Sequence, residues 1–184
     1  SNSGSEMALL PLGYCIDRTE VTQVDYKDWL DKTTASTLEN QPAECSLNKK
    51  FTPDCSASNP TSPTLWPPTI SMLDHPVVCV DWCDAYAYCA GMGKRLCGNI
   101  QGGSLGINDY QDASISQWYA ACTSGGIFPP TSFPYGSPYQ PNYCNDGTQS
   151  AVAVGSKLQC QSTITGYTGV YDLSGNVAEW EDCC

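Results

Sequence analysis

Twelve cysteines constrain this 184-residue chain more than any other feature of its sequence. Zinc sites usually contain Cys-x-x-Cys pairs, and no two of these cysteines have that spacing; the chain also has a single histidine, His75. Disulfides therefore explain the cysteines better than a metal cluster does. Because disulfides persist in oxidising compartments, we expect an extracellular or periplasmic protein whose fold is held by covalent bridges.

The charge balance of the chain excludes two classes of partner. Acidic residues outnumber basic ones 19 to 8, which gives a net charge of -11. Such a charge argues against binding to nucleic acids and to anionic membranes, and no run of residues is apolar enough to span a bilayer. The length suits one domain with its own core, so we expect a single domain over residues 1–184.

Three short helices are predicted from capping residues followed by apolar residues at helical spacing. Thr22 is expected to cap a helix over about residues 22–31. Asp81 caps a second helix, which ends near Gly91. Ser114 and Gln117 have the spacing of a capping box for a third helix.

Most of the remaining chain has no sustained hydrophobic period. Residues 1–8 are expected to form a disordered tail, and residues 32–74, rich in Ser, Thr, Pro and Asn, a long loop excursion. Short strands are expected at residues 9–16, 75–80, 151–154 and 168–171. Two disulfides are expected because each closes a short loop within one turn-rich region, namely Cys45–Cys55 and Cys144–Cys160; the other pairings cannot be read from sequence. The expected fold is α+β, disulfide-rich and low in regular secondary structure.

Four blocks of the chain occur in the order that they have in one known family. The blocks are residues 14–22 with Tyr26 and Trp29, residues 75–82 with 93–96, residues 114–121 with Gly125 and Gly126, and Tyr135-Gly136 with residues 169–180. Each block alone is weak, but four in this order indicate homology. The chain thus resembles the formylglycine-generating enzymes, or sulfatase-modifying factors, and the resemblance implies their C-type-lectin-like fold.

The same resemblance implies calcium sites. Residues 172–179 place two carboxylates seven residues apart around a Gly turn, and calcium prefers such hard oxygen ligands. By resemblance the first site uses the side chains of Asp172 and Glu179 and the main-chain carbonyls of Gly175 and Val177. The alternative is a surface turn whose acids are only solvated or cap a helix. A second family site corresponds to Asn142, Tyr143, Asp146 and Thr148.

The catalytic chemistry of the family is not carried by the residues of this chain. Family enzymes use two closely spaced cysteines, which bind copper and convert a substrate cysteine to formylglycine; that pair lies well downstream of the Gly-Asn-Val-x-Glu-Trp run. Cys183 and Cys184 follow the run too closely, so we interpret them as disulfide halves or a vicinal disulfide. His75 alone cannot supply an iron triad of two His and a carboxylate. We expect no catalytic residue here, and copper only with a further C-terminal segment.

Two functions remain open. The first is a secreted, non-catalytic module, made rigid by calcium and disulfides, that binds a protein or glycan partner or builds an extracellular structure. Without the family's last strands such a chain exposes a strand edge, so we expect self-association by strand addition, as oligomers or filaments. The alternative is a copper-dependent oxidase whose catalytic cysteines lie beyond residue 184. The residues present favour the non-catalytic module.

Overall fold

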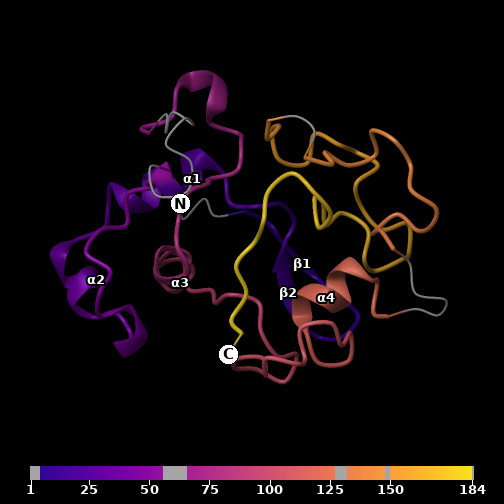
Figure 1. Cartoon of the computed structure of the whole chain (residues 1–184), viewed down its shortest axis with the longest axis horizontal. Coiled ribbons are helices and arrows are strands. Elements are labelled where there is room, and N and C mark those ends of the chain that lie inside the picture. The colour runs from indigo at the N-terminus through magenta and orange to yellow at the C-terminus, as the bar shows by residue number, and fades with distance from the viewer. Residues whose placement is uncertain (1–4, 56–65, 127–131, 148–149, 184) are drawn as a thin grey trace. The chain divides into compact units, whose positions relative to one another are not determined.

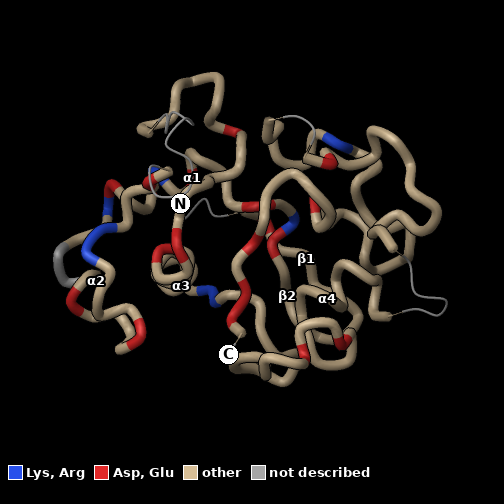
Figure 2. The backbone as a smooth tube through the Cα atoms, viewed as in Figure 1, with Lys and Arg blue, Asp and Glu red and all other residues tan. Residues whose placement is uncertain are grey.

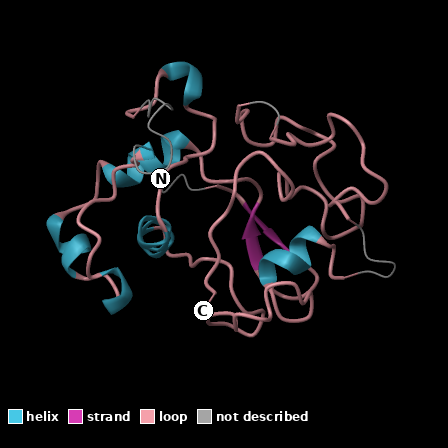
Figure 3. Cartoon of the chain, in the orientation of Figure 1, coloured by secondary structure: helices cyan, strands magenta, loops and turns pink. Residues whose placement is uncertain are grey.

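The computed structural model describes residues 5–55, 66–126, 132–147 and 150–183. The chain divides into two compact units, one formed by Val21–Leu96 and the other by Ser5–Glu20 together with Cys97–Cys184. Figure 1 traces the chain, and Figure 3 shows that turns and loops make up most of it. The predicted α+β fold with little regular structure is confirmed. No helix in the described residues has both the length and the apolar character needed to cross a membrane.

The first unit is built from short helices around an aromatic core. Its elements are α1 (Gln23–Leu30), α2 (Ala35–Glu39), the 3-10 turns η1 (Ala43–Cys45) and η3 (Ile70–Met72), and α3 (Trp82–Gly91). Tyr26 of α1 stacks on Tyr88 of α3 at 5.5 Å between ring centroids, and its hydroxyl donates to the Phe51 carbonyl at 2.7 Å. The aromatic rings therefore join both helices to the loop excursion.

The predicted caps of the first two helices are confirmed. The Thr22 hydroxyl accepts from the Asp25 N–H at 3.1 Å at the start of α1. Asp81 and Asp84 form a reciprocal capping box at the start of α3. Gly91 at the end of α3 faces the indole of Trp29 so closely that a Cβ would collide with it, so this glycine allows the close approach of the two helices.

The disulfides of the first unit differ from the sequence prediction. The structure joins Cys45 to Cys83 and Cys55 to Cys79, so the expected Cys45–Cys55 bridge is wrong. The excursion is thus not closed on itself but tied to α3 and to the segment before it. Spacing along the chain does not report this, because residues distant in sequence meet only after α1 and α3 have packed.

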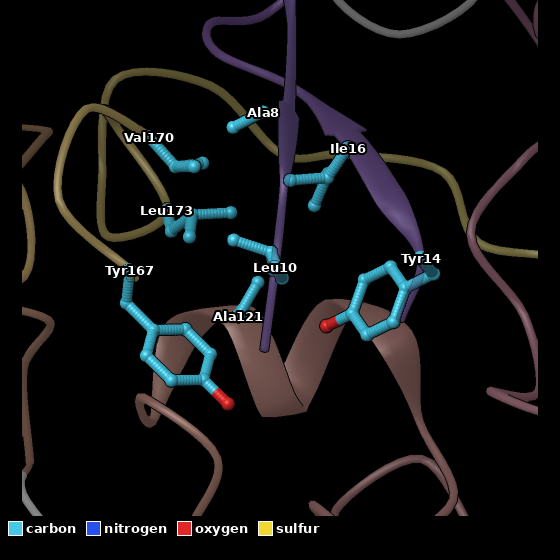
Figure 4. Close-up of a cluster of buried hydrophobic side chains, with 8 residues drawn as sticks. All are labelled: Ala8, Leu10, Tyr14, Ile16, Ala121, Tyr167, Val170 and Leu173. Atoms are coloured by element: carbon cyan, nitrogen blue, oxygen red, sulfur yellow. The ribbon is translucent and has the colours of Figure 1, made fainter. Parts of the chain in front are cut away.

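The described residues of the second unit form a two-stranded antiparallel sheet and the helix α4. Strand β1 (Met7–Leu9) pairs with β2 (Cys15–Asp17) with Ala8 opposite Ile16, and α4 spans Gln117–Cys122. Figure 4 shows the core, in which apolar side chains of the two strands meet Ala121 of α4 and side chains of the segment that carries Val170. The core therefore fixes that C-terminal segment against the sheet.

Several predicted strands and boundaries are wrong. Residues 9–16 form not one strand but a hairpin, which turns where Gly13 has a φ of +86°, and β1 includes Met7 and Ala8 of the expected tail; residues 1–4 lie outside the described part. Residues 75–80 form only an isolated bridge from Pro76 to Thr22, since Cys79 has a φ of +63°, which leaves the extended region. In the described residues, segments 151–154 and 168–171 also contain no strand.

Candidate cation site

Two buried carboxylates lie next to each other in the second unit. Glu20 is 9% exposed and Asp172 is 1% exposed. Oε2 of Glu20 and Oδ1 of Asp172 are buried, and neither has a hydrogen-bond partner among the described residues. Such atoms are rare in native proteins because each costs about 1–3 kcal/mol. The pair is therefore arranged either to share a proton or to ligate a cation.

The backbone after β2 positions these acids. The Tyr171 N–H donates to the Arg18 carbonyl at 2.8 Å. Because Glu20 follows Arg18 by two residues and Asp172 follows Tyr171 directly, this hydrogen bond brings the two carboxylates to the same place. Asp172 has a φ of +60°, and its Oδ2 accepts from the Gly155 N–H at 2.6 Å, which leaves Oδ1 as its available ligand atom.

Asn176 holds the loop that follows. Its Nδ2 donates to Oε1 of Glu20 at 3.0 Å, and its Oδ1 accepts from the Val152 N–H at 2.9 Å and from Nδ2 of Asn145 at 3.1 Å. The preceding Gly175 has a φ of +89°, and a Cβ there would collide with the Asn145 carbonyl. The loop thus has one conformation that a glycine and an asparagine enforce together.

The carboxylates disfavour one another's charge. Burial raises the pKa of Glu20 to about 8, with further contributions from Asp172 and Glu179. Burial also raises the pKa of Asp172, whereas the Gly155 N–H and a proton shared with the Glu20 side chain lower it. The pKa of Glu179 is raised to about 7, first by loss of solvent around the carboxylate and then by Asp172 and Glu181, although the residue as a whole keeps an exposed surface. Three neighbouring carboxylates of this kind favour a bound positive charge.

Glu179 belongs to the acidic C-terminal segment, whose negative residues Figure 2 marks in red near the C-terminal end. Its Oε2 accepts from Nε1 of Trp118 in α4 at 3.1 Å. This hydrogen bond orients the side chain, and Oε1 accepts none from the described residues, so it can serve another partner. Asp172 and Glu179 are the first and last acids of the predicted calcium loop. They lie near enough that the charge of Asp172 raises the pKa of Glu179.

The oxygen atoms gathered in this loop, from carboxylates and main-chain carbonyls, fit a hard cation. No group of three or more His, Cys, Asp or Glu side chains in the described ranges has the arrangement of a metal centre. The carbonyls of Gly175 and Val177 accept no main-chain hydrogen bond from described residues. Two carboxylates supplemented by carbonyl oxygens are ligands that calcium accepts and that zinc or copper would not select.

The second predicted ligand set does not form a comparable buried cluster in the described residues. Asn142, Tyr143 and Asp146 are exposed, and Oδ2 of Asp146 accepts from the Tyr139 hydroxyl at 2.8 Å. Thr148 lies outside the described residues. Calcium at this set stays a prediction.

The cysteines of the second unit are placed as follows. Cys144 is bonded to Cys160, as expected from the sequence. Cys183 lies in a parallel bridge with Leu105, and Cys184 lies outside the described residues. The raised pKa of Cys122, about 11, is due first to burial and then to Glu179, so this thiol is not activated as a nucleophile.

Sequence reasoning missed two residues of the site, Glu20 and Asn176. Both stand in the quoted family motifs, Glu20 in Glu-Val-Thr and Asn176 in Gly-Asn-Val. The sequence signal for a role was present, but their mutual contact at 3.0 Å joins residues 156 positions apart, and neither composition nor spacing reveals such a contact.

Comparison with known proteins agrees with this architecture. A family model described as "Sulfatase-modifying factor enzyme 1-like domain" matches residues 6–184. The chain is 32% identical over 117 residues to the bovine (Bos taurus) "Inactive C-alpha-formylglycine-generating enzyme 2", covering 59% of this chain and 33% of that protein. The mouse (Mus musculus) protein of the same name is 31% identical over 117 residues, covering 59% and 32%. The matches thus span about a third of these relatives. The chain belongs to the family of sulfatase-modifying factor enzyme 1-like domains.

Proposed function

We propose that this chain is a secreted, non-catalytic module of its family, stabilised by calcium and disulfides, with an extracellular binding or structural role. Three disulfides support an oxidising compartment. The relatives named above carry the word "inactive" in their names, which supports a role without catalysis. The acidic charge of -11 supports a soluble surface that attracts cations rather than nucleic acid.

The observation that carries the calcium proposal is the pair of buried carboxylate oxygens without a partner, on Glu20 and Asp172. A divalent cation bound by Asp172 satisfies its unpartnered oxygen and compensates the negative charge of the neighbouring Glu20 and Glu179. We assign the side chains of Asp172 and Glu179 and the carbonyls of Gly175 and Val177 as ligands. Glu20 lies beside them and contributes its negative charge rather than a third acidic ligand, since the described residues contain no metal-binding group of three such side chains. Calcium supplies rigidity here by crosslinking the segment after β2 to the C-terminal loop.

Calcium titration tests this proposal. Isothermal calorimetry on chelator-treated protein should show one site with a dissociation constant of about 0.1–1 mM or tighter, as in extracellular modules, and the melting temperature should rise with calcium. Magnesium serves as the control and should bind more weakly, because it demands a smaller, octahedral site. Absence of both heat and melting shift would refute the calcium assignment.

Family membership favours a second candidate, the copper-dependent oxidation of a cysteine in a partner protein to formylglycine. Mass spectrometry of a cysteine-containing peptide, incubated with the full protein and copper under oxygen, detects the aldehyde directly. We expect no product above the level of copper alone. Accumulation of aldehyde that needs the protein would replace the non-catalytic proposal.

Self-association by strand addition belongs to the structural version of the proposal. Size-exclusion chromatography with light scattering should then show oligomers whose size increases with protein concentration. A monomer at all concentrations would restrict the role of the module to binding.

A further inference from the structure

A hollow of about 550 Å³ lies in the second unit. Glu20, Asp172 and Glu179 do not line it, whereas Tyr143 of the second predicted calcium set does. Two loop segments, residues 135–143 and 158–168, contribute its lining. The Cys144–Cys160 disulfide joins these segments, since Cys144 directly follows the first and Cys160 lies within the second. Their Cα atoms are 4.7 Å apart, so the bridge sets the separation of the two walls. A volume of this size suits a small organic ligand.

The first wall presents tyrosine rings that neighbouring aromatic groups hold in place. Tyr135 stacks on Phe133 with centroids 5.2 Å apart and an angle of 2° between the rings, and it meets Tyr143 edge-on at 5.0 Å. Its hydroxyl accepts from the Gln140 N–H at 3.3 Å. Tyr143 remains 37% exposed. The wall therefore offers a supported aromatic surface at which a ligand can pack.

The second wall presents amides and hydroxyls, some fixed and some available. Gln161 is locked, since its Nε2 donates to the Leu158 carbonyl at 2.7 Å and its Oε1 accepts from the Gly169 N–H at 2.8 Å. The exposed side chains of Gln159 and Thr163 form no hydrogen bond with other described residues. This wall thus combines a rigid base with free donors and acceptors at its surface.

The chemistry of the lining restricts the ligand. Among the described residues that line the hollow, none is charged, although the chain as a whole carries a net charge of -11. An anion would find no cationic partner and a cation no carboxylate, while an apolar ligand would leave the amides and hydroxyls unpaired. A ligand that is neither anionic, cationic nor apolar fits this lining, and a neutral ligand rich in hydroxyl groups has these properties. Its hydroxyls can donate and accept like the amides, and its C–H faces can pack on tyrosine.

We propose that this hollow binds a neutral oligosaccharide, with Tyr143 as the packing surface and Gln159 as a hydrogen-bonding residue. A polar peptide is the nearest competing ligand. One way in which peptides bind is by adding to a strand edge, and no strand lies in the described parts of either wall; the experiment below tests the other ways with a peptide. This sugar-binding proposal rests on the proposed function, because it specifies the partner of the non-catalytic binding module.

Saturation-transfer NMR and calorimetry with cellotriose, mannotriose and N-acetyllactosamine test this proposal. At least one of these sugars should bind with a dissociation constant of about 1 mM or tighter. Tyr143→Ala should abolish binding, and Gln159→Ala should weaken it about tenfold or more. The matched controls are Tyr110→Ala and Gln101→Ala, which remove exposed residues of the same types outside the hollow and should leave binding unchanged.

Two results would overturn the assignment. The first is no binding of any of the three sugars. The second is sugar binding that both hollow variants leave intact. If the sugars fail and a Gly-Ser-Asn peptide binds in a way that Gln159→Ala abolishes, the first result holds and the hollow is a peptide site. If Tyr143→Ala unfolds the protein, Gln159→Ala decides, because its side chain supports no described contact. The calcium-dependent melting shift is measured on the same samples, so failure of sugar binding leaves the non-catalytic, calcium-stabilised module independently tested.

Discussion

Glu20 separates the two explanations of the buried acid pair. In a shared-proton pair, Glu20→Gln keeps the geometry, because the Gln oxygen still accepts from Asn176 and its amide donates to Asp172. In a calcium site, the same change removes a negative charge next to the cation. We therefore expect calcium affinity to fall at least about tenfold, or about 1.4 kcal/mol, as measured by calorimetry, while the melting temperature in chelator stays the same or rises.

The matched control for this variant is Glu39→Gln, which changes an exposed carboxylate of the first unit and should leave calcium affinity unaltered. If Glu20→Gln binds calcium as tightly as the natural chain, the charge of Glu20 does not stabilise the bound ion, and its buried oxygen is satisfied by a proton shared with Asp172.

Asp84 gives a pH dependence in the first unit. It is 5% exposed, and burial raises its pKa from 3.8 to about 6, against the lowering effect of its hydrogen bonds from Asp81 and Asn48. A raised pKa means that the folded state binds this proton more tightly than the unfolded state does. Stability should therefore increase as pH falls from about 6 to about 4, by about 1–3 kcal/mol, and be lost again as pH rises through 6.

Asp84→Asn removes this titration, so the difference in unfolding free energy between variant and natural chain should change over the same pH interval. Carbon NMR of the Asp84 carboxyl provides an independent measurement. A titration midpoint near 4 would show that its hydrogen bonds outweigh its burial.

The structure and the sequence pattern place the N-cap of α4 at different residues. The pattern places the cap at Ser114, but the structure gives that role to Ser116, which is fully buried and accepts from the Tyr119 N–H at 3.0 Å. Ser114 instead donates to Asp112 at the surface. Ser116→Ala should reduce the unfolding free energy by about 1 kcal/mol or more, whereas Ser114→Ala should change it by less than about 0.5 kcal/mol. Denaturant titration measures both, and the opposite ranking would support the cap read from sequence.

Helices were predicted better than strands because their signals are local. Thr22 and Asp81 cap α1 and α3 as expected, since a cap involves residues three apart. The strands expected around Val77 and Val152 are absent, because a strand requires a partner segment that runs alongside it. Next to Val77, Pro76 pairs with Thr22 in an isolated bridge, and the Val152 N–H donates to the side chain of Asn176 rather than to a neighbouring main chain. β-propensity alone does not report such a partner.

The candidate site was half predictable for the same reason. Asp172, Gly175 and Glu179 lie within one short run, so a motif resemblance identifies them together. Glu20 reaches the site through the pairing of Tyr171 with the residues after β2, and Cys45 meets Cys83 only once α3 has packed. Both are long-range consequences of the fold, and a single sequence contains no local pattern for them.

At the scale of the whole molecule, disulfides and calcium should stabilise the chain to different degrees. The bridges described above join residues separated by 38, 24 and 16 positions, and each should contribute about 3–4 kcal/mol by restricting the unfolded chain. Their sum, about 9–12 kcal/mol, is comparable to the whole stability of a typical domain, about 5–15 kcal/mol, whereas calcium at a hundred times its dissociation constant adds about 2.7 kcal/mol. In differential scanning calorimetry, chelation should therefore lower the melting temperature but preserve a cooperative transition, and full reduction should abolish that transition even with calcium present. A reduced chain that still melts cooperatively would show that the aromatic core of the first unit and the sheet of the second suffice to fold it, and that the cysteines serve another purpose.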